Sequence, residues 1–361
     1  MQFGVYIHFP WCRKRCPYCD FAVELGDPPH ARYADAIVDE LAARAPAYDA
    51  AGDLVSIYVG GGTPSLWHPD ELARAVAAVR ARFGGDPLEI TVEANPTDLD
   101  DAHLAAWRAA GVTRLSIGVQ SHAADELVVL GRDHRFGDGP AAVARGLAHR
   151  GFEISADYIL GVPTGRAALP PEPPATGHAS VYELTIEDRT AFGQRARDGR
   201  LVPLADDALA ELYIATHHAF TAAGFEHYEI SSYARPGKRA VHNSLYWQGA
   251  PYLGLGASAA SLAVAPDGSG TRTTNPRRAD AYLAGAPAEV AHHDPREMAA
   301  DRAWLAMRTR DGVAETVLPA ALAGELVDRG LAERLGGRIC PTLRGFLMAD
   351  RVATRIVQAL P

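Results

Sequence analysis

The sequence predicts an α/β protein: a partial barrel of the TIM-like (β/α)6 type, followed by a small C-terminal winged-helix-like domain. First, short β-rich segments alternate with amphipathic helical segments through the first half of the 361 residues, which is typical of parallel strands joined by helical crossovers. Second, six such strands occur in series, which favours a barrel, complete or partial, over an open two-half sheet. Third, residues 295–361 have the order helix, helix, hairpin, helix.

Each element of the first half has its own signal. The helix at 30–45 carries Tyr33, Ile37 and Leu41 on one stripe, and Pro46 ends it. The strand at 54–59 runs into a glycine triplet, which is typical of a tight turn. The predicted strands span residues 2–9, 54–59, 88–93, 112–119, 152–160 and 181–186, and the predicted helices between them span residues 30–45, 70–83, 99–110 and 140–150.

The second half is less regular. Four of the five residues 170–174 are proline, so the connection at 163–174 is predicted to be a loop or extended stretch rather than a crossover helix. A further helix is predicted at 206–223, an irregular connector at 266–287 and a hairpin turn at Gly336-Gly337. We therefore divide the chain into a barrel at 1–235, a middle segment with the connector at 236–294 and the winged-helix-like domain at 295–361.

Composition argues against several classes of protein. The chain has 35 basic and 44 acidic side chains and a net charge of −9, so we expect no nucleic-acid partner bound through a broad basic face. The winged-helix-like domain is therefore expected to be an interaction module or a lid. The longest weakly polar run, 253–265, falls short of the roughly 20 apolar residues of a spanning helix. With no charged leader before the first apolar segment, the sequence predicts a cytoplasmic protein.

Three of the four cysteines are gathered at one place. Cys12, Cys16 and Cys19 follow the first predicted strand, whereas Cys340 lies in the C-terminal hairpin and is expected to be a buried bystander. Three thiolates from one loop can hold three irons of a cubane cluster and leave the fourth iron open. A zinc knuckle is the alternative, although structural zinc sites usually have a fourth Cys or His at matched spacing.

Other chemistry-bearing residues lie near the ends of the predicted strands. A glycine triplet, residues 60–62, follows the second strand, and such glycines let the backbone approach a ligand and point N–H groups toward a carboxylate. Glu93 and Gln120 end the third and fourth strands, and Asp157 lies on the fifth. Because the carboxyl ends of barrel strands meet at one mouth, these side chains are predicted to share a cavity.

These motifs resemble those of known proteins. The Cys-x3-Cys-x2-Cys spacing with Tyr18, together with Gly-Gly-Gly-Thr-Pro at 60–64, resembles the radical S-adenosylmethionine (SAM) superfamily. Nearly the whole chain is similar to the oxygen-independent coproporphyrinogen III oxidase family. The stretches that carry this likeness are residues 6–12, 60–65, 114–121, 130–132, 182–187 and 342–347.

The resemblance implies a fold of the radical SAM type and a set of ligands. Cys12, Cys16 and Cys19 would ligate a [4Fe–4S] cluster, whose open iron would be chelated by the amine and carboxylate of SAM. An electron donor for the cluster is then an expected partner. The residues that match the family's SAM contacts are Tyr6, Tyr18, Gly61, Gly62, Thr63, Glu93, Gln120, Arg132 and Asp157.

Two branches share this scaffold, and three features separate them. The oxidases carry a fourth cysteine where this chain has Phe21, and they have an N-terminal extension for which Cys12 leaves no room. The stretch from His242 to Trp247 matches the His-Asn-x-x-Tyr-Trp motif of the haem chaperone branch. The resemblance thus implies a haem carrier with His242 as a candidate haem ligand, which delivers haem to haem-dependent respiratory proteins, reached at the membrane only through a partner.

Some features depart from this pattern, and alternatives stay open. A histidine that relatives have after Gly254-Leu255-Gly256 is replaced by Ala260, and the proline-rich loop stands where relatives have a crossover helix. The main alternative is an oxygen-independent coproporphyrinogen III oxidase, a radical SAM enzyme of porphyrin biosynthesis. A third is an interaction protein with a purely structural cluster. The sequence leaves open whether SAM is cleaved and whether the chain forms a homodimer.

Overall fold

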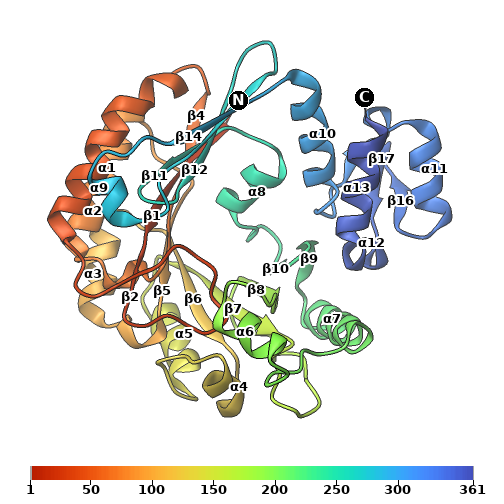
Figure 1. The fold of residues 1–361 in the computed structure, drawn as a ribbon, viewed down its shortest axis with the longest axis horizontal. Helices are drawn as coiled ribbons and strands as arrows, with labels where there is room; N and C mark the ends of the chain where they lie inside the picture. The colour runs from red at the N-terminus through yellow and green to blue at the C-terminus, as the bar shows by residue number, and fades with distance from the viewer. Residues whose placement is uncertain (1, 361) are drawn as a thin grey trace.

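A computed structural model describes residues 2–360. Its centre is a twelve-stranded sheet, which curves so that helices α1, α2 and α3 lie on its outer side and helix α8 on its inner side (Figure 1). Six neighbouring parallel strands follow one another in chain order, which confirms the predicted partial barrel. They are β1 (Gln2–Phe9), β4 (Asp53–Gly61), β5 (Glu89–Ala94), β6 (Arg114–Gln120), β7 (Glu153–Leu160) and β8 (His178–Glu183).

The strands are buried on both faces. Ile57 and Val59 of β4 and Val92 of β5 are fully buried in the main core, whereas the intervening Tyr58 and Glu93 line an inner cavity. The helices of this half are α1 (His30–Arg44), α2 (Pro69–Phe83), α3 (Asp101–Ala109), α4 (Ala124–Val129), α5 (Asp138–Ala148), α6 (Ala191–Arg197) and α7 (Asp206–Ala222). Shorter elements are β2 (Trp11–Cys12), β3 (Glu24–Leu25) and the 3-10 turns η1 (Ala45–Tyr48), η2 (Pro64–Leu66) and η3 (Pro96–Asp98).

The proline-rich connection between β7 and β8 forms neither helix nor strand at 163–174, as predicted. The chain then continues through strands that extend both edges of the barrel sheet. On one edge β11 (Tyr252–Leu255) pairs in parallel with β1, and β12 (Ala260–Val264), β13 (Gly270–Thr274) and β14 (Glu289–His293) follow antiparallel. On the other edge lie β10 (Ser232–Ala234) and β9 (Glu226–Glu229), and the helices of this region are α8 (Val241–Trp247) and α9 (Ala279–Leu283).

The prediction of an irregular connector at 266–287 was wrong. β13 and α9 both lie within it, and β13 pairs with strands on both sides. The Pro- and Gly-rich composition hid a hairpin whose turn is closed by the Asp267 carboxylate, which accepts a hydrogen bond from the Ser269 N–H at 2.9 Å. The strand itself is rich in threonine, a β-branched residue that suits strands.

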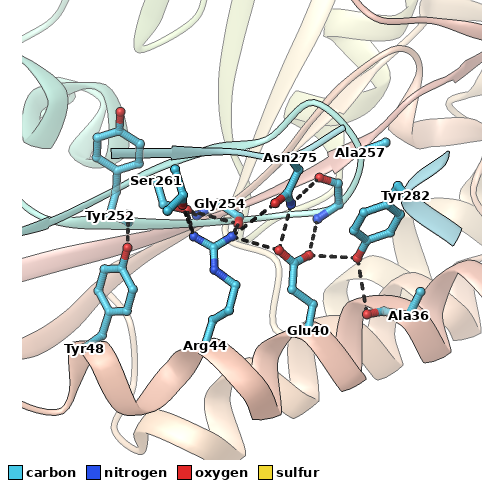
Figure 2. Close-up of polar contacts among 12 residues, drawn as sticks. Ala36, Glu40, Arg44, Tyr48, Tyr252, Gly254, Ala257, Ser261, Asn275 and Tyr282 are labelled. Carbon is cyan, nitrogen blue, oxygen red and sulfur yellow. Dashed lines mark hydrogen bonds and ion pairs between the residues drawn. The ribbon is translucent and has the colours of Figure 1, made fainter. Parts of the chain in front are cut away.

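A buried polar cluster fastens this extension to α1 (Figure 2). Arg44 projects from the helix and donates to Glu40 one turn earlier at 2.8 Å, to the Gly254 carbonyl at 3.0 Å and to the Ser261 hydroxyl at 2.7 Å. It also donates to Thr273 of β13. A single guanidinium therefore connects the helix to β11, β12 and β13.

Glu40 completes the cluster. Its carboxylate accepts hydrogen bonds from the Gly256 N–H at 2.8 Å, the Asn275 amide at 2.7 Å and the Tyr282 hydroxyl at 2.8 Å (Figure 2). Both oxygens are thus satisfied by groups more than 200 residues away in the chain. Such saturation is what a largely buried carboxylate requires.

The C-terminal module has a core of its own, built from Met307, Val313, Leu322, Ile339 and Ile356 among others. A three-stranded sheet and helices form it, which confirms the winged-helix-like fold, and the hairpin turns at Gly336 and Gly337, both with positive φ. Its elements are α10 (Pro295–Ala306), β15 (Val313–Ala314), η4 (Glu315–Val317), α11 (Ala320–Asp328), β16 (Ala332–Leu335), β17 (Arg338–Pro341), α12 (Leu343–Leu347) and α13 (Ala349–Ala359). The domain boundaries assigned from the sequence stay predictions.

Across residues 2–360, none of the helices combines the length and the apolar composition needed to cross a membrane.

Candidate functional site

The three clustered cysteines are free thiols: Cys12 ends β2, and Cys16 and Cys19 lie on the loop that joins β2 to β3. Thr63 donates to Cys12 Sγ at 3.2 Å, and an Arg132 guanidinium nitrogen lies 3.8 Å from Cys16 Sγ. Burial raises the pKa of Cys12 to about 11 and also raises the pKa of Cys19. A hydroxyl donor and a cation beside the sulfurs favour thiolates once a metal displaces the protons. The chemistry of the three thiols therefore suits a thiolate-ligated cluster, whereas within residues 2–360 no three such side chains are placed to hold a single metal ion.

This loop covers a cavity of about 420 Å³ at the carboxyl ends of the barrel strands. Its walls come from the cysteine loop and from β4, β5, β6, β7 and β8, so the predicted convergence of strand ends is present. The predicted site residues that line it are Cys12, Cys16, Cys19, Tyr18, Gly61, Gly62, Thr63, Glu93, Gln120, Arg132 and Asp157.

The glycine triplet is required by close packing inside the protein. Gly61 has φ +118°, and a Cβ there would lie 2.6 Å from the His8 ring. The Gly61 N–H donates to Glu93 at 3.0 Å, and the Gly62 N–H donates to the Phe9 carbonyl at 2.8 Å. The sequence predicted that these N–H groups point toward a ligand carboxylate, but those of Gly61 and Gly62 are hydrogen-bonded within the protein. The triplet instead shapes the wall of the cavity.

Two buried carboxyl groups face the cavity. Glu93 accepts from the Tyr58 hydroxyl at 2.8 Å, and Asp157 accepts from Ser116 at 2.7 Å and from Ser155 at 3.1 Å. Burial raises the pKa of Glu93 to about 7 against these hydrogen bonds, and burial also raises the pKa of Asp157. A cationic ligand in the cavity would favour the ionised forms of both. The pair therefore fits a ligand that carries an ammonium or sulfonium group.

The cavity also contains a group that can bind an anion, the guanidinium of Arg132. Its guanidinium donates to Asn95 at 2.7 Å, but its Nε is buried without a hydrogen-bond partner in the described part of the chain. Next to it Gln120 adopts φ +65°, at an irregularity in the pairing of β6 with β7. Strained residues and orphaned donors gather where a ligand binds. The cavity thus offers both signs of charge to a zwitterionic ligand such as an amino acid group.

Tyr6 lies outside the cavity lining. Its hydroxyl is hydrogen-bonded to His8 Nδ1 at 3.0 Å, and its ring stacks on Tyr58 with centroids 6.0 Å apart. Tyr58 in turn lines the cavity. A direct contact of Tyr6 with SAM stays a prediction, and in the structure it supports the residue that holds Glu93.

His242 also lies apart from the cavity, on α8, and is only 1% exposed. Its Nδ1 is 2.8 Å from the Ser56 hydroxyl and its Nε2 is 2.9 Å from the Tyr246 hydroxyl. Burial lowers its pKa to about 3, so the ring is neutral. The Glu89 carboxylate accepts a hydrogen bond from the backbone N–H of His242 at 3.0 Å and fixes the start of helix α8. Ligation of haem iron by His242 stays a prediction, which requires one of the two hydroxyls to release a ring nitrogen.

Residues 6–164 match the family model "Radical SAM superfamily". Heme chaperone HemW of Mycobacterium tuberculosis is 35% identical over a gapped alignment of 377 positions, which covers 98% of this chain and 95% of the relative. Heme chaperone HemW of Escherichia coli is 38% identical over 303 residues, which cover 78% of this chain and 76% of the relative.

This chain belongs to the HemW branch of the radical SAM superfamily. The resemblance stated from the sequence motifs is thereby confirmed. Coproporphyrinogen III oxidase (HemN) of Escherichia coli has a similar solved structure, with a TM-score of 0.76 over 98% of this chain and 89% of that one. At 19% identity this match shows the shared fold, including the partial barrel, and supports no statement about activity.

Several cavity residues of this HemW family member escaped the sequence analysis. Ser116 and Gly118 lie four and two residues before Gln120 on β6, and Tyr58 lies two residues before the glycine triplet. Since strand side chains alternate between faces, residues at even spacing from a predicted contact share its face. That period-2 pattern was the signal available for them. Asn95 follows β5 directly and had no such signal.

Proposed function

We propose that this protein is a haem chaperone that holds a [4Fe–4S] cluster, binds SAM and delivers haem to haem-dependent respiratory proteins. The observation that carries the proposal is the likeness to curated HemW haem chaperones over nearly the whole chain. The position of Phe21 supports it, because the side chain at the place of the oxidases' fourth cysteine is apolar and 65% exposed at the cavity rim.

In this proposal the three cysteines hold the cluster, and the cluster supplies one-electron chemistry toward SAM when both are bound. The protein's part is to bind and orient. Glu93 and Asp157 would attract the cationic groups of SAM, and Arg132 would attract its carboxylate while its charge stabilises the thiolate of Cys16. The strand-end walls of the cavity would shield the cofactors from water.

Helix α8 is the proposed haem-binding element. It carries the His-Asn-x-x-Tyr-Trp stretch and lies on the inner side of the sheet (Figure 1). Its contacts connect it to the cofactor cavity, because the His242 ring lies 5.1 Å from the Tyr58 ring, whose hydroxyl donates to Glu93. Helix α8 is therefore connected to the proposed SAM site through the side chains of His242 and Tyr58.

The test is a haem titration of the anaerobically reconstituted full-length protein, followed in the Soret region. We expect saturable binding by the wild type. Loss or displacement of the Soret band in His242→Ala, with no change when the exposed His218 of α7 is replaced in His218→Ala, would support ligation by His242. Identical spectra for wild type and His242→Ala would reject that ligand while leaving haem binding intact. Absence of any Soret change in the wild type would reject the chaperone function.

An anaerobic assay with coproporphyrinogen III, SAM and a reductant is the companion experiment. We expect no protoporphyrinogen, because the cavity has Phe21 in place of the fourth cysteine. Clear product formation would replace the proposal with the oxidase activity.

A further inference from the structure

A second cleft, of about 570 Å³, borders α8, and it shares no lining residue with the cofactor cavity. It is bounded by α8, by the end of β9 and by the C-terminal module, which is fastened there by the Arg310 N–H on the Tyr228 carbonyl at 2.8 Å. Its lining residues are Tyr228, Arg239, Ser244, Trp247, Gln248, Arg302, Ala306, Thr309, Asp311, Gly312 and Arg338.

The cleft carries an excess of positive charge, with three guanidinium groups against the single carboxylate of Asp311. Arg239 is paired with Asp311 at 2.8 Å and with Glu226. Arg338 donates to the backbone carbonyls of Asp311 at 2.6 Å and Gly312 at 2.8 Å. The side chain of Arg302 has no hydrogen bond or ion pair within residues 2–360, so its charge is available to a ligand.

A second observation points to a ligand in the same place. The Nε1 of Trp247 is buried but has no hydrogen-bond partner in the described structure. The Trp247 ring packs near the Arg308 guanidinium, 5.9 Å from its centroid. The Trp247 ring and the Arg302 guanidinium line the same cleft, an arrangement that suits an aromatic ligand with carboxylates.

Helical periodicity explains why the His-Asn-x-x-Tyr-Trp stretch of α8 has residues on two different faces of the helix. At about 100° per residue, Ser244, Trp247 and Gln248 share one face of α8, whereas His242 and Tyr246 lie on another. The first group lines the cleft, and the second is bonded to each other and to Ser56 inside the barrel. The polar inner pair thus holds the helix so that Trp247 forms the roof of the cleft.

We propose that this cleft binds the carboxylate edge of haem. The inference rests on the proposed chaperone function and assigns a place to its ligand. Haem combines a flat apolar ring with two ionised carboxylates, and guanidinium groups bind carboxylates in a bidentate manner while an indole stacks on the ring. The volume falls within the roughly 300–1,000 Å³ of small-molecule sites. Arg302 and Arg338 bind the carboxylates. Because His242 does not line the cleft, it acts here as a positioning residue for α8, and ligation of haem iron by His242 in the titration above would overturn the assignment of haem to this cleft.

The experiment compares two probes on the reconstituted full-length protein: haem, and iron protoporphyrin IX dimethyl ester, whose carboxylates are blocked. Arg302→Gln keeps the side-chain stem that packs on Gly249 and removes the charge. We expect it to weaken haem binding about tenfold, since a charge-assisted hydrogen bond is lost, and Arg302→Gln with Arg338→Gln to weaken it further. The ester is expected to bind wild type and variants alike. Arg351→Gln, an exposed charge removal on neighbouring α13, is the matched control and should bind haem as the wild type does.

The outcomes separate the two proposals. If the wild type binds haem and the double variant binds it equally well, the cleft is rejected and the chaperone function stands. If the ester loses as much affinity as haem in Arg302→Gln, carboxylate recognition is rejected. Failure of the wild type to bind haem rejects the chaperone function itself. Thermal unfolding midpoints within a few degrees of the wild type would show that the variants are folded.

Discussion

The two buried polar regions of this protein are built to opposite rules. Around Arg44 and Glu40, each charged group meets several partners, and the carboxylate and guanidinium also pair with each other (Figure 2). In the cofactor cavity, Glu93 and Asp157 line the same space, and burial raises the pKa values of both. The Nε of Arg132 has no hydrogen-bond partner among the described residues.

The difference indicates what each region is for. A saturated cluster needs nothing from outside and serves to connect elements that are distant in sequence. Carboxyl groups that are hydrogen-bonded but lack a paired cation keep a cost in free energy that a bound cationic ligand can relieve, and such groups mark functional sites. If this comparison is right, mutations in the first region should act on stability and mutations in the second on ligand binding.

The largest effect is expected for Arg44→Met. The substitution leaves Glu40 buried without its cation and removes the donor that joins β11, β12 and β13 to α1. Breaking a buried pair in this way costs about 3–5 kcal/mol. Urea unfolding of the cofactor-free protein measures the loss.

The double variant Glu40→Gln with Arg44→Met is the informative partner, because it removes the uncompensated charge and should recover part of the stability. Arg355→Met breaks an exposed ion pair with Glu325 and should cost less than about 1 kcal/mol. A cost for Arg44→Met as small as that of Arg355→Met would contradict the interpretation of the cluster.

The cluster was beyond the reach of the sequence for a physical reason. Glu40 and Arg44 stand four residues apart on an amphipathic helix, a spacing typical of exposed surface pairs. Their burial depends on β11 to β13, which lie more than 200 residues later in the chain and extend the barrel sheet beside α1. Local patterning carries no information about that event.

The barrel and most of the cavity were predictable because their signals are local. Apolar runs of strand length end in glycine, glutamate or glutamine at 60, 93 and 120, and the parallel fold brings those ends together. The strands β9, β10 and β13, which lie outside the barrel, were missed because they are three to five residues long and have polar or glycine-rich sequences. The partner hydroxyls of His242 were missed because Ser56 belongs to a buried apolar strand and comes close only through folding.

A smaller effect, of pH, should come from Glu93. Its pKa in the folded protein is about 7, above the ordinary value of 4.5, so the unfolded chain loses this proton first as pH rises. The stability contribution is therefore complete below pH 4.5 and is lost as pH rises through about 7, by about 3 kcal/mol in total.

Urea unfolding of the cofactor-free protein at pH 5, 6, 7 and 8 measures this loss. Glu93→Gln cannot ionise, so its stability should fall less over the same range. A wild-type profile parallel to that of Glu93→Gln would contradict a raised pKa for this carboxyl group.

The smallest effect on folding, and the sharpest on binding, is expected for Asp157→Asn. The amide keeps the size of the side chain and still accepts a hydrogen bond from Ser116 or Ser155, so the unfolding midpoint should change by only a few degrees. If Asp157 attracts a cationic group of SAM, loss of its charge should weaken SAM binding about tenfold by calorimetry on the reconstituted protein. Arg44→Met should show the reverse pattern, with reduced stability and unchanged SAM affinity in the folded fraction. Wild-type SAM affinity in Asp157→Asn would contradict the assignment of the cavity to ligand binding, because the Asp157 carboxylate would then make no contribution to SAM binding.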